Sequence, residues 1–449
     1  MRSYPLHFGI LVMLGYLLEA VAGAQTQPVQ SQSQPPTTQA PAPPASQLSQ
    51  KPGSQLISLD QAIQMAVTHN HNLLATRTTV QQNEAEEITA NLRPDPVLLG
   101  DVQFLPIFQP ENLSSDYLDN TAQFDLGVSY LFERGKKRQH RVTAARAATA
   151  VSRAQASDAE RTLEFNVASS FINIELAEST LELANQDLKS SENSVNITEE
   201  RYKAGQIGYD DFLKMKLQFL QFQMDVSQAK LARAQGLSDL RQLVGYESVG
   251  ENYDVESSFD YQPLSAGLED LQAMALKTRP DLQAAQLGVT AANSQFQLQK
   301  SIGKRDVTGQ ISYTHVSALN QIALYGQIQL PIFDRNQGEI KRAGFAITQA
   351  QQQQLYTSGQ VLTDVRDAYQ GWKANDEIVQ LYRQGYLDES QKSRDITEYA
   401  YRHGAASLLD FLDAERSFRS TQLGYRQAMS SYLLSLEQLR QAVGTRSLR

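Results

Sequence analysis

An internal repeat constrains this chain more than any other feature of the sequence. The stretch from Tyr202 to Leu213 returns as Tyr401 to Leu412, and the stretch from Arg241 to Gly245 returns at the same offset as Arg440 to Gly444. No insertion separates the two copies over this length. A duplication of this size predicts two equivalent structural units in one chain.

The front halves of the two units match as well, at a larger offset, for example Met65-Ala66 with Met274-Ala275. Unit one is therefore expected over residues 57–245 and unit two over residues 264–444. Residues 246–263 are rich in Tyr, Asp, Ser and Pro, and we interpret them as a linker.

The N-terminal region has the pattern of an exported protein. Residues 1–24 combine Arg2, a short apolar run and the small residues Ala22-Gly23-Ala24, which is typical of a secretory signal peptide. Residues 25–56 consist largely of Gln, Pro, Ser and Thr and are predicted to be a disordered tether. The chain has no cysteine, so disulfides and thiolate metal sites are excluded.

Most of each unit is predicted to be helical. Residues 136–202 contain no proline, and as one helix they would be ~100 Å long. Residues 339–401 are their counterpart in unit two. Second helices are expected over 210–243 and 409–443, where apolar and small residues recur every seven positions, as in helices that pack along a seam.

Four short segments alternate between apolar and polar residues and predict β-strands: residues 97–105, 121–132, 307–316 and 322–330. They form a hairpin over residues 97–132 in unit one and a hairpin over residues 307–330 in unit two. Each strand is about as long as the ~9–11 residues that cross a membrane in a β-barrel. Each unit is thus expected to run helix, hairpin, long helix, turn, helix.

Four strands cannot close a barrel, and open sheet edges do not occur in lipid, so several chains must share one barrel. An eight-stranded barrel is filled by its own side chains, so a conduit favours three chains or more. Composition alone leaves open a second interpretation, in which both hairpins are half-buried on a water-soluble domain. The signal peptide favours the barrel.

The duplicated unit, the two hairpins of the chain and the glycine turns followed by Asp-Phe-Leu resemble the TolC-type outer-membrane efflux channels. The segment from Pro331 to Gly338, with Arg279-Pro280-Asp281-Leu282, resembles most the heavy-metal, cobalt–zinc–cadmium type branch. The resemblance covers residues 57–444. It implies a mainly α protein with a membrane β-barrel: a homotrimer with twelve strands in the outer membrane of a Gram-negative bacterium and a long α-helical barrel in the periplasm.

The resemblance also implies a function and its partners. Such channels are passive exit ducts of tripartite efflux systems, bound to a periplasmic adaptor protein and an inner-membrane pump of the resistance-nodulation-division type. Asp410 and Asp413 match positions that form carboxylate rings at the tunnel entrance. Tyr401 and Asp211 match positions whose hydrogen bonds hold that entrance closed. Gly205 and Gly404 match the turns that contact the adaptor.

Two residues depart from the family pattern. Ala406 stands where the best-known member has an arginine in the entrance contacts, and Lys214 of unit one stands at the position equivalent to Asp413. We therefore hypothesise that Lys214 pairs with a nearby aspartate. For Asp410 and Asp413 the residues alone favour a simpler interpretation, in which they cap a helix N-terminus and interact with its dipole.

The sequence offers no pattern for catalysis or tight metal binding. We find no nucleophile triad, phosphate loop or zinc-protease motif, and the histidines lack the spacing of metal ligands. We therefore expect no enzyme activity, no cofactor and no resident metal. The net charge of -9 and the absence of a basic stripe argue against a nucleic-acid partner.

Alternative functions remain open from the sequence. The same duct could serve multidrug efflux or type I protein secretion. A function of another class is a secreted helical scaffold or adhesin with two hairpins. The lipid of the outer membrane is an expected partner only if the barrel forms.

Overall fold

The computed structural model describes residues 55–256 and 259–448. The predicted signal peptide, and the predicted tether up to residue 54, lie outside the described residues. The helices are α2 (Leu59–His69), α3 (His71–Asn91), α4 (Ser115–Asn120), α5 (Lys137–Lys203), α6 (Tyr209–Val244), α7 (Leu268–Thr278), α8 (Pro280–Ile302), α9 (Gln337–Leu381), α10 (Leu387–Arg402) and α11 (Leu408–Val443). The strands are β1 (Gln55–Ile57), β2 (Val97–Gln103), β3 (Gln123–Phe132), β4 (Tyr253–Val255), β5 (Val307–Val316) and β6 (Leu319–Ile328), and the short turns are η1 (Pro110–Asn112) and η2 (Tyr382–Tyr386).

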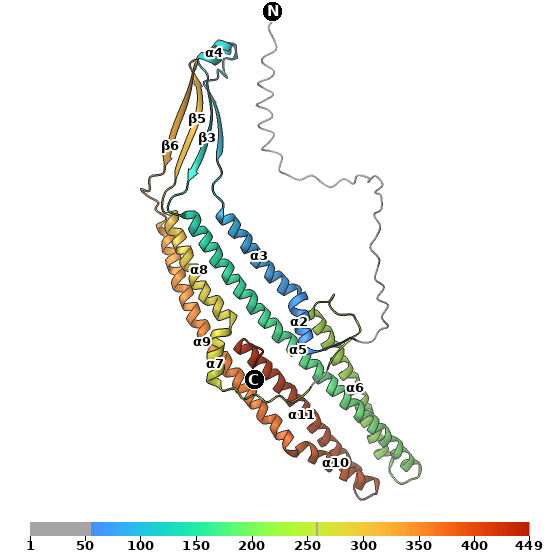
Figure 1. The fold of residues 1–449 in the computed structure, drawn as a ribbon. Coiled ribbons are helices and arrows are strands. Elements are labelled where there is room, and N and C mark those ends of the chain that lie inside the picture. The colour runs from blue at the N-terminus through green and yellow to red at the C-terminus, as the bar shows by residue number, and fades with distance from the viewer. Residues whose placement is uncertain (1–54, 257–258, 449) are drawn as a thin grey trace, which may run out of the picture. The chain divides into compact units, whose positions relative to one another are not determined.

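The repeat predicted from the sequence organises these elements. In each unit two helices lead into a pair of strands, a long helix returns from the strands, and a glycine turn reverses the chain into a last helix of 36 residues (Figure 1). α5 is a single helix of 67 residues, about 100 Å of chain at 1.5 Å per residue. This order confirms the predicted run of helix, hairpin, long helix, turn and helix.

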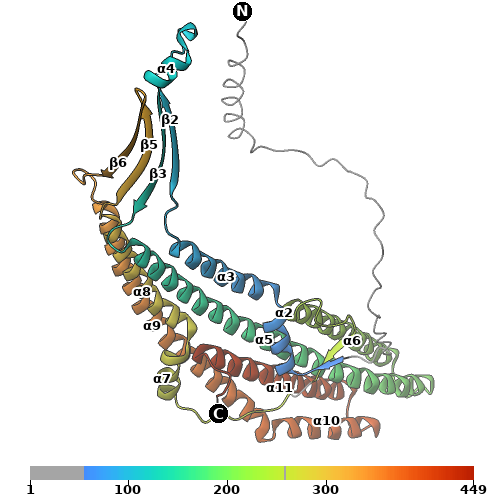
Figure 2. The same ribbon diagram turned by 45° about the horizontal axis from the view of Figure 1, so that its top comes forward.

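The two hairpins combine into one antiparallel sheet with the strand order β2-β3-β5-β6. The central pair joins the two units, since Leu126 of β3 lies opposite Tyr313 of β5, which lies opposite Ile322 of β6. The sheet lies at one end of the long helices and the glycine turns at the other (Figures 1 and 2). Strand β5 matches its predicted bounds, whereas β2 ends two residues earlier and β6 begins three residues earlier than expected.

The faces of this sheet differ as the alternation predicts. Its apolar face is open, with Leu126, Ile311 and Leu324 all more than half exposed. The opposite face is polar, and it is buried only at its centre: Ser312 and Thr314 of β5 are buried, and the Thr314 hydroxyl donates a hydrogen bond to Asp125. An apolar outer face and a polar inner face are typical of membrane barrel strands.

The helical part has one apolar core for each unit. One core is built from α2, α3, α5, α6 and β4, the other from α7, α8, α9 and α11, with Ile172 of α5 joining the second. Leu240 and Leu439, which are equivalent in the repeat, are both fully buried. Within residues 55–256 and 259–448, no helix is both long enough and apolar enough for a membrane crossing.

Two features were not anticipated from the sequence. Residues 253–255, inside the predicted linker, form β4, which pairs in parallel with β1 and places Val255 in the core of unit one. The second long helix is also interrupted: α9 ends at Leu381, one π-helical turn follows, and Gly385 adopts a φ of 126°. That φ is far from the helical value, and only glycine adopts it readily. The helix is therefore interrupted at Gly385, and the expected continuous helix over 339–401 is wrong.

Candidate functional site at the helical tips

The two hairpin turns at the tips have the same backbone geometry. The α5–α6 turn contains Gly205 at φ 69°, and the α10–α11 turn contains Gly404 at φ 75°. Each glycine N–H donates to the carbonyl of the tyrosine three residues earlier, Tyr202 or Tyr401, at 2.9 and 3.1 Å. These are left-handed helix C-caps. A Cβ at either glycine would contact nothing, so backbone conformation alone requires glycine there.

Asp410 serves as a capping residue within its own chain. The backbone N–H of Asp410 donates to the Ser407 hydroxyl at 3.2 Å, and the Ser407 N–H donates to the Asp410 carboxylate at 3.1 Å. This reciprocal pair is a capping box at the start of α11. The hydrogen bonds from Ser407 lower the pKa of Asp410. The exposed carboxylate is thus held ionised at the tip.

The charges around the tips differ between the units. Asp413 accepts a hydrogen bond from Arg416 one turn later, at 3.0 Å. Its unit-one equivalent, Lys214, lies 2.6 Å from the Asp210 carboxylate and 3.8 Å from Asp211. The hypothesis that Lys214 pairs with a nearby aspartate is confirmed. These contacts raise the pKa of Lys214, chiefly through the hydrogen bond to Asp210.

Tyr401 lies between the two helical hairpins, α5–α6 and α10–α11. It is buried with Met215 of α6 and Phe411 of α11, and its ring stacks on Phe411 with centroids 5.3 Å apart. Tyr202 stacks on Phe212 in the same way in unit one, at 5.4 Å. The Tyr401 hydroxyl is buried and has no hydrogen-bond partner among the described residues. The Tyr401 hydroxyl therefore makes no hydrogen bond to Asp211 within the described residues of one chain, and the expected bonds would need a neighbouring chain.

A polar layer above the tips was missed by sequence reasoning. Arg419 of α11 inserts between the two helices of the other unit, with its Nε 3.3 Å from Asp187 of α5 and a hydrogen bond to Asp225 of α6. Burial raises the pKa of Asp187, and the positive charge of Arg419 partly offsets that rise. One guanidinium thus joins three helices. Because the layer connects residues about 200 positions apart and Arg419 is not repeated in unit one, no local pattern could reveal it.

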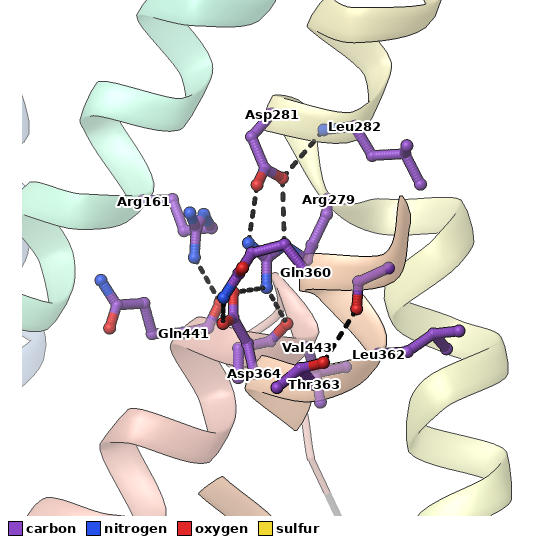
Figure 3. A network of polar contacts seen from close by, with 12 residues as sticks. Arg161, Arg279, Asp281, Leu282, Gln360, Leu362, Thr363, Asp364, Gln441 and Val443 are labelled. Carbon is purple, nitrogen blue, oxygen red and sulfur yellow. Dashed lines mark hydrogen bonds and ion pairs between the residues drawn. The ribbon is translucent and has the colours of Figure 1, made fainter. Parts of the chain in front are cut away.

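Arg279, in the motif that suggested the metal branch, has a structural position (Figure 3). Its buried guanidinium binds Asp281 at 2.6 Å and Asp364 at 2.9 Å, and donates to the Ala442 carbonyl at the end of α11. Asn70, its unit-one equivalent, donates to the Leu243 carbonyl at the end of α6 at 2.9 Å. In both units, therefore, the C-terminus of the last helix is hydrogen-bonded to the residue that precedes the helix leading into the strands, α3 in unit one and α8 in unit two.

Four of the five histidines in the described residues take part in local side-chain contacts. His69 and His403 each lie within hydrogen-bond distance of a backbone carbonyl one turn earlier, while His71 and His315 face Glu247 and Asp119. No group of three or more histidine, aspartate or glutamate side chains in residues 55–256 and 259–448 is arranged to hold a metal ion.

Comparison with known proteins identifies the family. The model of the family described as "Outer membrane efflux protein" matches residues 100–246 and 271–445. The chain belongs to this family. The duplicated fold, the outer-membrane location and the efflux-channel resemblance expected from the sequence are thereby confirmed.

Individual relatives are distant but span much of the chain. The cobalt-zinc-cadmium resistance protein CzcC of Cupriavidus metallidurans is 23% identical over 379 residues, covering 82% of this chain and 85% of that protein. The pyoverdine export outer membrane protein OpmQ of Pseudomonas putida is 23% identical over 420 residues, covering 86% and 85%. The cation efflux system protein CusC of Escherichia coli K12 is 25% identical over 274 residues, covering 57% and 58%.

Solved structures agree on the fold. A crystal structure of CusC superposes with a TM-score of 0.72 at 21% identity and covers 91% of this chain and 99% of that chain. The Campylobacter jejuni outer membrane channel CmeC superposes with the same TM-score at 16% identity, covering 91% and 94%. At these identities the likeness establishes the fold alone, and the cargo needs a separate argument.

Proposed function

We propose that this protein is the outer-membrane exit duct of a tripartite efflux system that exports heavy-metal cations. Membership of the outer membrane efflux protein family is the observation that supports a function as a duct. The cargo is supported by the resistance and cation-efflux relatives named above and by the acidic residues exposed at the tips. A duct supplies no chemistry of its own, so we also propose that it is not an enzyme and that the pump provides the energy.

The assembly we propose is a homotrimer. Both outer strands of the sheet, β2 and β6, leave an edge without a partner in one chain. Successive strands in the order β2-β3-β5-β6 are antiparallel, so β6 of one copy can pair antiparallel with β2 of the next and close a ring. Three copies would give twelve strands.

The partners we propose are a periplasmic adaptor and a resistance-nodulation-division type pump in the inner membrane. The glycine turns at Gly205 and Gly404 lie farthest from the sheet and would face the adaptor (Figure 1). Both turns keep their amides inside their own caps, so adaptor contacts would fall on the exposed side chains around them.

Asp410 and Asp413 are proposed to repeat around the threefold axis as two carboxylate rings. They are three positions apart on α11 and both are exposed. Rings of carboxylates favour cations at a constriction. Tyr401, with its unpaired hydroxyl, and Asp211 are proposed to bond between neighbouring helices of different chains when the entrance is closed.

Cargo can be tested by deletion. A strain lacking this protein should become sensitive to divalent metals such as cobalt, zinc or cadmium, and the gene supplied in trans should restore resistance. Sensitivity to organic drugs should change little. A deletion strain with unchanged metal tolerance and lost drug tolerance would assign the duct to multidrug efflux instead.

The entrance can be tested by conductance. In a planar bilayer, Asp410→Asn with Asp413→Asn should lower the preference for cations over anions severalfold, while Asp388→Asn, higher on α10, serves as a matched control. A reciprocal exchange of Lys214 and Asp413 should alter closed-state conductance. Unchanged selectivity in the double variant would mean that these aspartates only cap and solvate α11.

A second cargo class is favoured by one observation. OpmQ, whose name assigns it to pyoverdine export, matches as much of this chain as the metal-resistance relative does. A cargo of that kind would pass through the same acidic entrance. Export assays with a free divalent cation and with pyoverdine would separate the two cargoes.

A further inference from the structure

The junction between the sheet and the helices carries a cluster of cations that the efflux function does not use. Arg93 follows α3, and Lys136 and Arg138 lie at the start of α5, directly after β3. We propose that these three residues bind the headgroup of an anionic phospholipid in the membrane leaflet that adjoins the helices. This surface is defined here as the basic junction.

A cavity of about 450 Å³ lies at the basic junction. Its cationic side is formed by Arg93, Lys136 and Arg138, and its apolar side by Tyr130 and Phe132 at the end of β3. The two aromatic rings meet edge to face, with centroids 4.9 Å apart. Aromatic rings at the level of the headgroups are characteristic of membrane-spanning proteins.

The cations of the basic junction have no carboxylate partner within the described residues. Two nearby acids are already engaged: Asp306 binds the buried Lys137 at 2.6 Å, and Glu133, which lines the cavity, is held by Arg141. Asp95, two residues after Arg93, is exposed and forms no ion pair with the three cations. Lys136 is exposed and Arg138 is half-buried. Three unpaired positive charges beside an apolar wall are complementary to a lipid with a negative headgroup and acyl chains.

The apolar wall continues in the direction that a lipid requires. Phe132 begins the row of exposed apolar residues on β3 that includes Val128 and Leu126. A headgroup held by Lys136 and Arg138 would therefore place its acyl chains along the open face of the sheet. A free phosphate ion would use only the cationic half of this surface.

The equivalent junction of unit two is charged as well, but its cations are engaged differently. At its equivalent junction Arg305 is paired with Asp334 and Arg342 with Glu339. The residue in the left-handed conformation before the long helix is Asn336 in unit two and Lys136 in unit one. Unit two thus pairs Arg305 and Arg342 with carboxylates, while Lys304 and Arg335 at the same junction are exposed and form no ion pair among the described residues.

The inference rests on the proposed insertion of the sheet into the outer membrane. It can be tested with the full-length trimer in nonionic detergent, by native mass spectrometry with added phosphatidylglycerol or phosphatidylcholine of the same chain length. Each cation near an anionic headgroup strengthens binding about fivefold. The variant R93Q/K136N/R138Q should therefore bind phosphatidylglycerol roughly 10- to 100-fold more weakly and phosphatidylcholine unchanged.

Two further variants make the result specific. The charge-preserving variant R93K/K136R/R138K should keep the preference for phosphatidylglycerol. The variant R366Q/K373Q/K392Q removes three exposed cations from α9 and α10, away from the sheet, and should also keep it. Asn at position 136 reproduces the residue of unit two, so the backbone conformation there is retained.

Three outcomes would overturn the proposal: unchanged phosphatidylglycerol binding in R93Q/K136N/R138Q, an equal loss in the α9–α10 control, or competition by inorganic phosphate at the concentration that matches the lipid. Conductance of the same preparations in phosphatidylcholine bilayers tests the proposed channel function independently of lipid binding. A wild-type trimer without conductance would contradict the proposed function whatever the lipid result.

Discussion

At the scale of single residues, the two tips show how one backbone design carries different chemistry. Gly205 and Gly404 occupy the same left-handed position, but the helices that follow begin differently. Ser407 caps α11 through its hydroxyl, whereas Gly208 begins α6 with the same extended backbone and no side-chain cap. Repeat symmetry is therefore kept in the turn and lost in the cap.

The cap difference predicts opposite effects of two substitutions. Ser407→Ala removes the hydroxyl that binds the Asp410 amide and should destabilise the protein by about 1 kcal/mol. Gly208→Ser should stabilise it by a few tenths of a kcal/mol, because its φ of -75° suits serine and a Cβ there would contact nothing. Thermal unfolding of the trimers measures both. A stabilising Ser407→Ala variant would contradict the capping role.

Asp187 predicts a pH dependence with a definite sign. Burial raises its pKa above the value of about 3.9 found in unfolded chains. At a pH between the unfolded and the folded pKa of Asp187, the folded chain binds more protons than the unfolded chain. The protonated carboxyl therefore stabilises the fold below pH ~4, and this stabilisation is lost as the pH rises through the folded pKa.

The variant Asp187→Asn should remove that contribution. The difference in unfolding temperature between the wild type and the variant should shrink or reverse as pH rises from about 4 to 7. Asp410→Asn is a useful contrast, since the lowered pKa of Asp410 makes its contribution present above pH ~4 and lost below it. A pH-independent difference for Asp187→Asn would show that burial does not control its protonation.

At the scale of elements, the two long helices are equivalent in sequence position but not in continuity. α5 is unbroken, while its counterpart divides at the π-helical turn around Gly385. Tyr261 of the linker is fastened just before this break, donating to Asp376 at 2.7 Å and stacking on Tyr432 of α11. Burial, reinforced by the hydrogen bond to Asp376, raises the pKa of Tyr261 to about 12. The break thus lies where the linker crosses unit two.

The packing of the π-helical turn depends on Gly424 of α11. A Cβ at Gly424 would lie 2.5 Å from the Tyr382 hydroxyl oxygen but 3.4 Å from the ring carbon that carries it. Gly424→Ala should therefore destabilise the protein by about 1–2 kcal/mol through overpacking. Adding Tyr382→Phe should restore much of the loss, and a double-mutant cycle measures the coupling. Additive effects would place the two residues out of contact.

At the scale of the whole molecule, the sheet is open at both edges while its apolar face is exposed. One chain leaves β2 and β6 unpaired, and a sheet in lipid cannot keep free edges. The helical part does not share this problem, because each unit has its own core. The sheet therefore depends on neighbouring chains more strongly than the helices do.

The absence of cysteine permits a direct test of barrel closure. Cysteine at Gly100, in the middle of β2, can be combined in turn with cysteine at each β6 position from Gln321 to Tyr325. Oxidation should give a covalent trimer for at least one pair, whereas either single cysteine should give no trimer. Covalent products limited to dimers would contradict a closed three-chain ring.

The sequence by itself determined the repeated elements, and the reason is local periodicity. Spacing of 3.6 residues and alternation of two residues place side chains on faces before any tertiary contact forms. This is why most of the helices, the four strands of the large sheet and both glycine turns could be predicted, whereas β1, β4 and the break in the second long helix could not. The resemblance then supplied the family and the roles proposed for Asp410, Asp413, Tyr401 and Asp211.

Only the tertiary structure decided which distant residues meet. The pairing of β1 with β4, the position of Arg419 between Asp187 and Asp225, and the free cations of the basic junction all join segments far apart in the chain. The residues around Lys136 in the sequence do not indicate that it lacks a carboxylate partner. It lacks one because Asp306 pairs with Lys137 and Glu133 pairs with Arg141 in the folded chain. Burial and charge pairing are properties of the packed chain, and periodicity does not encode them.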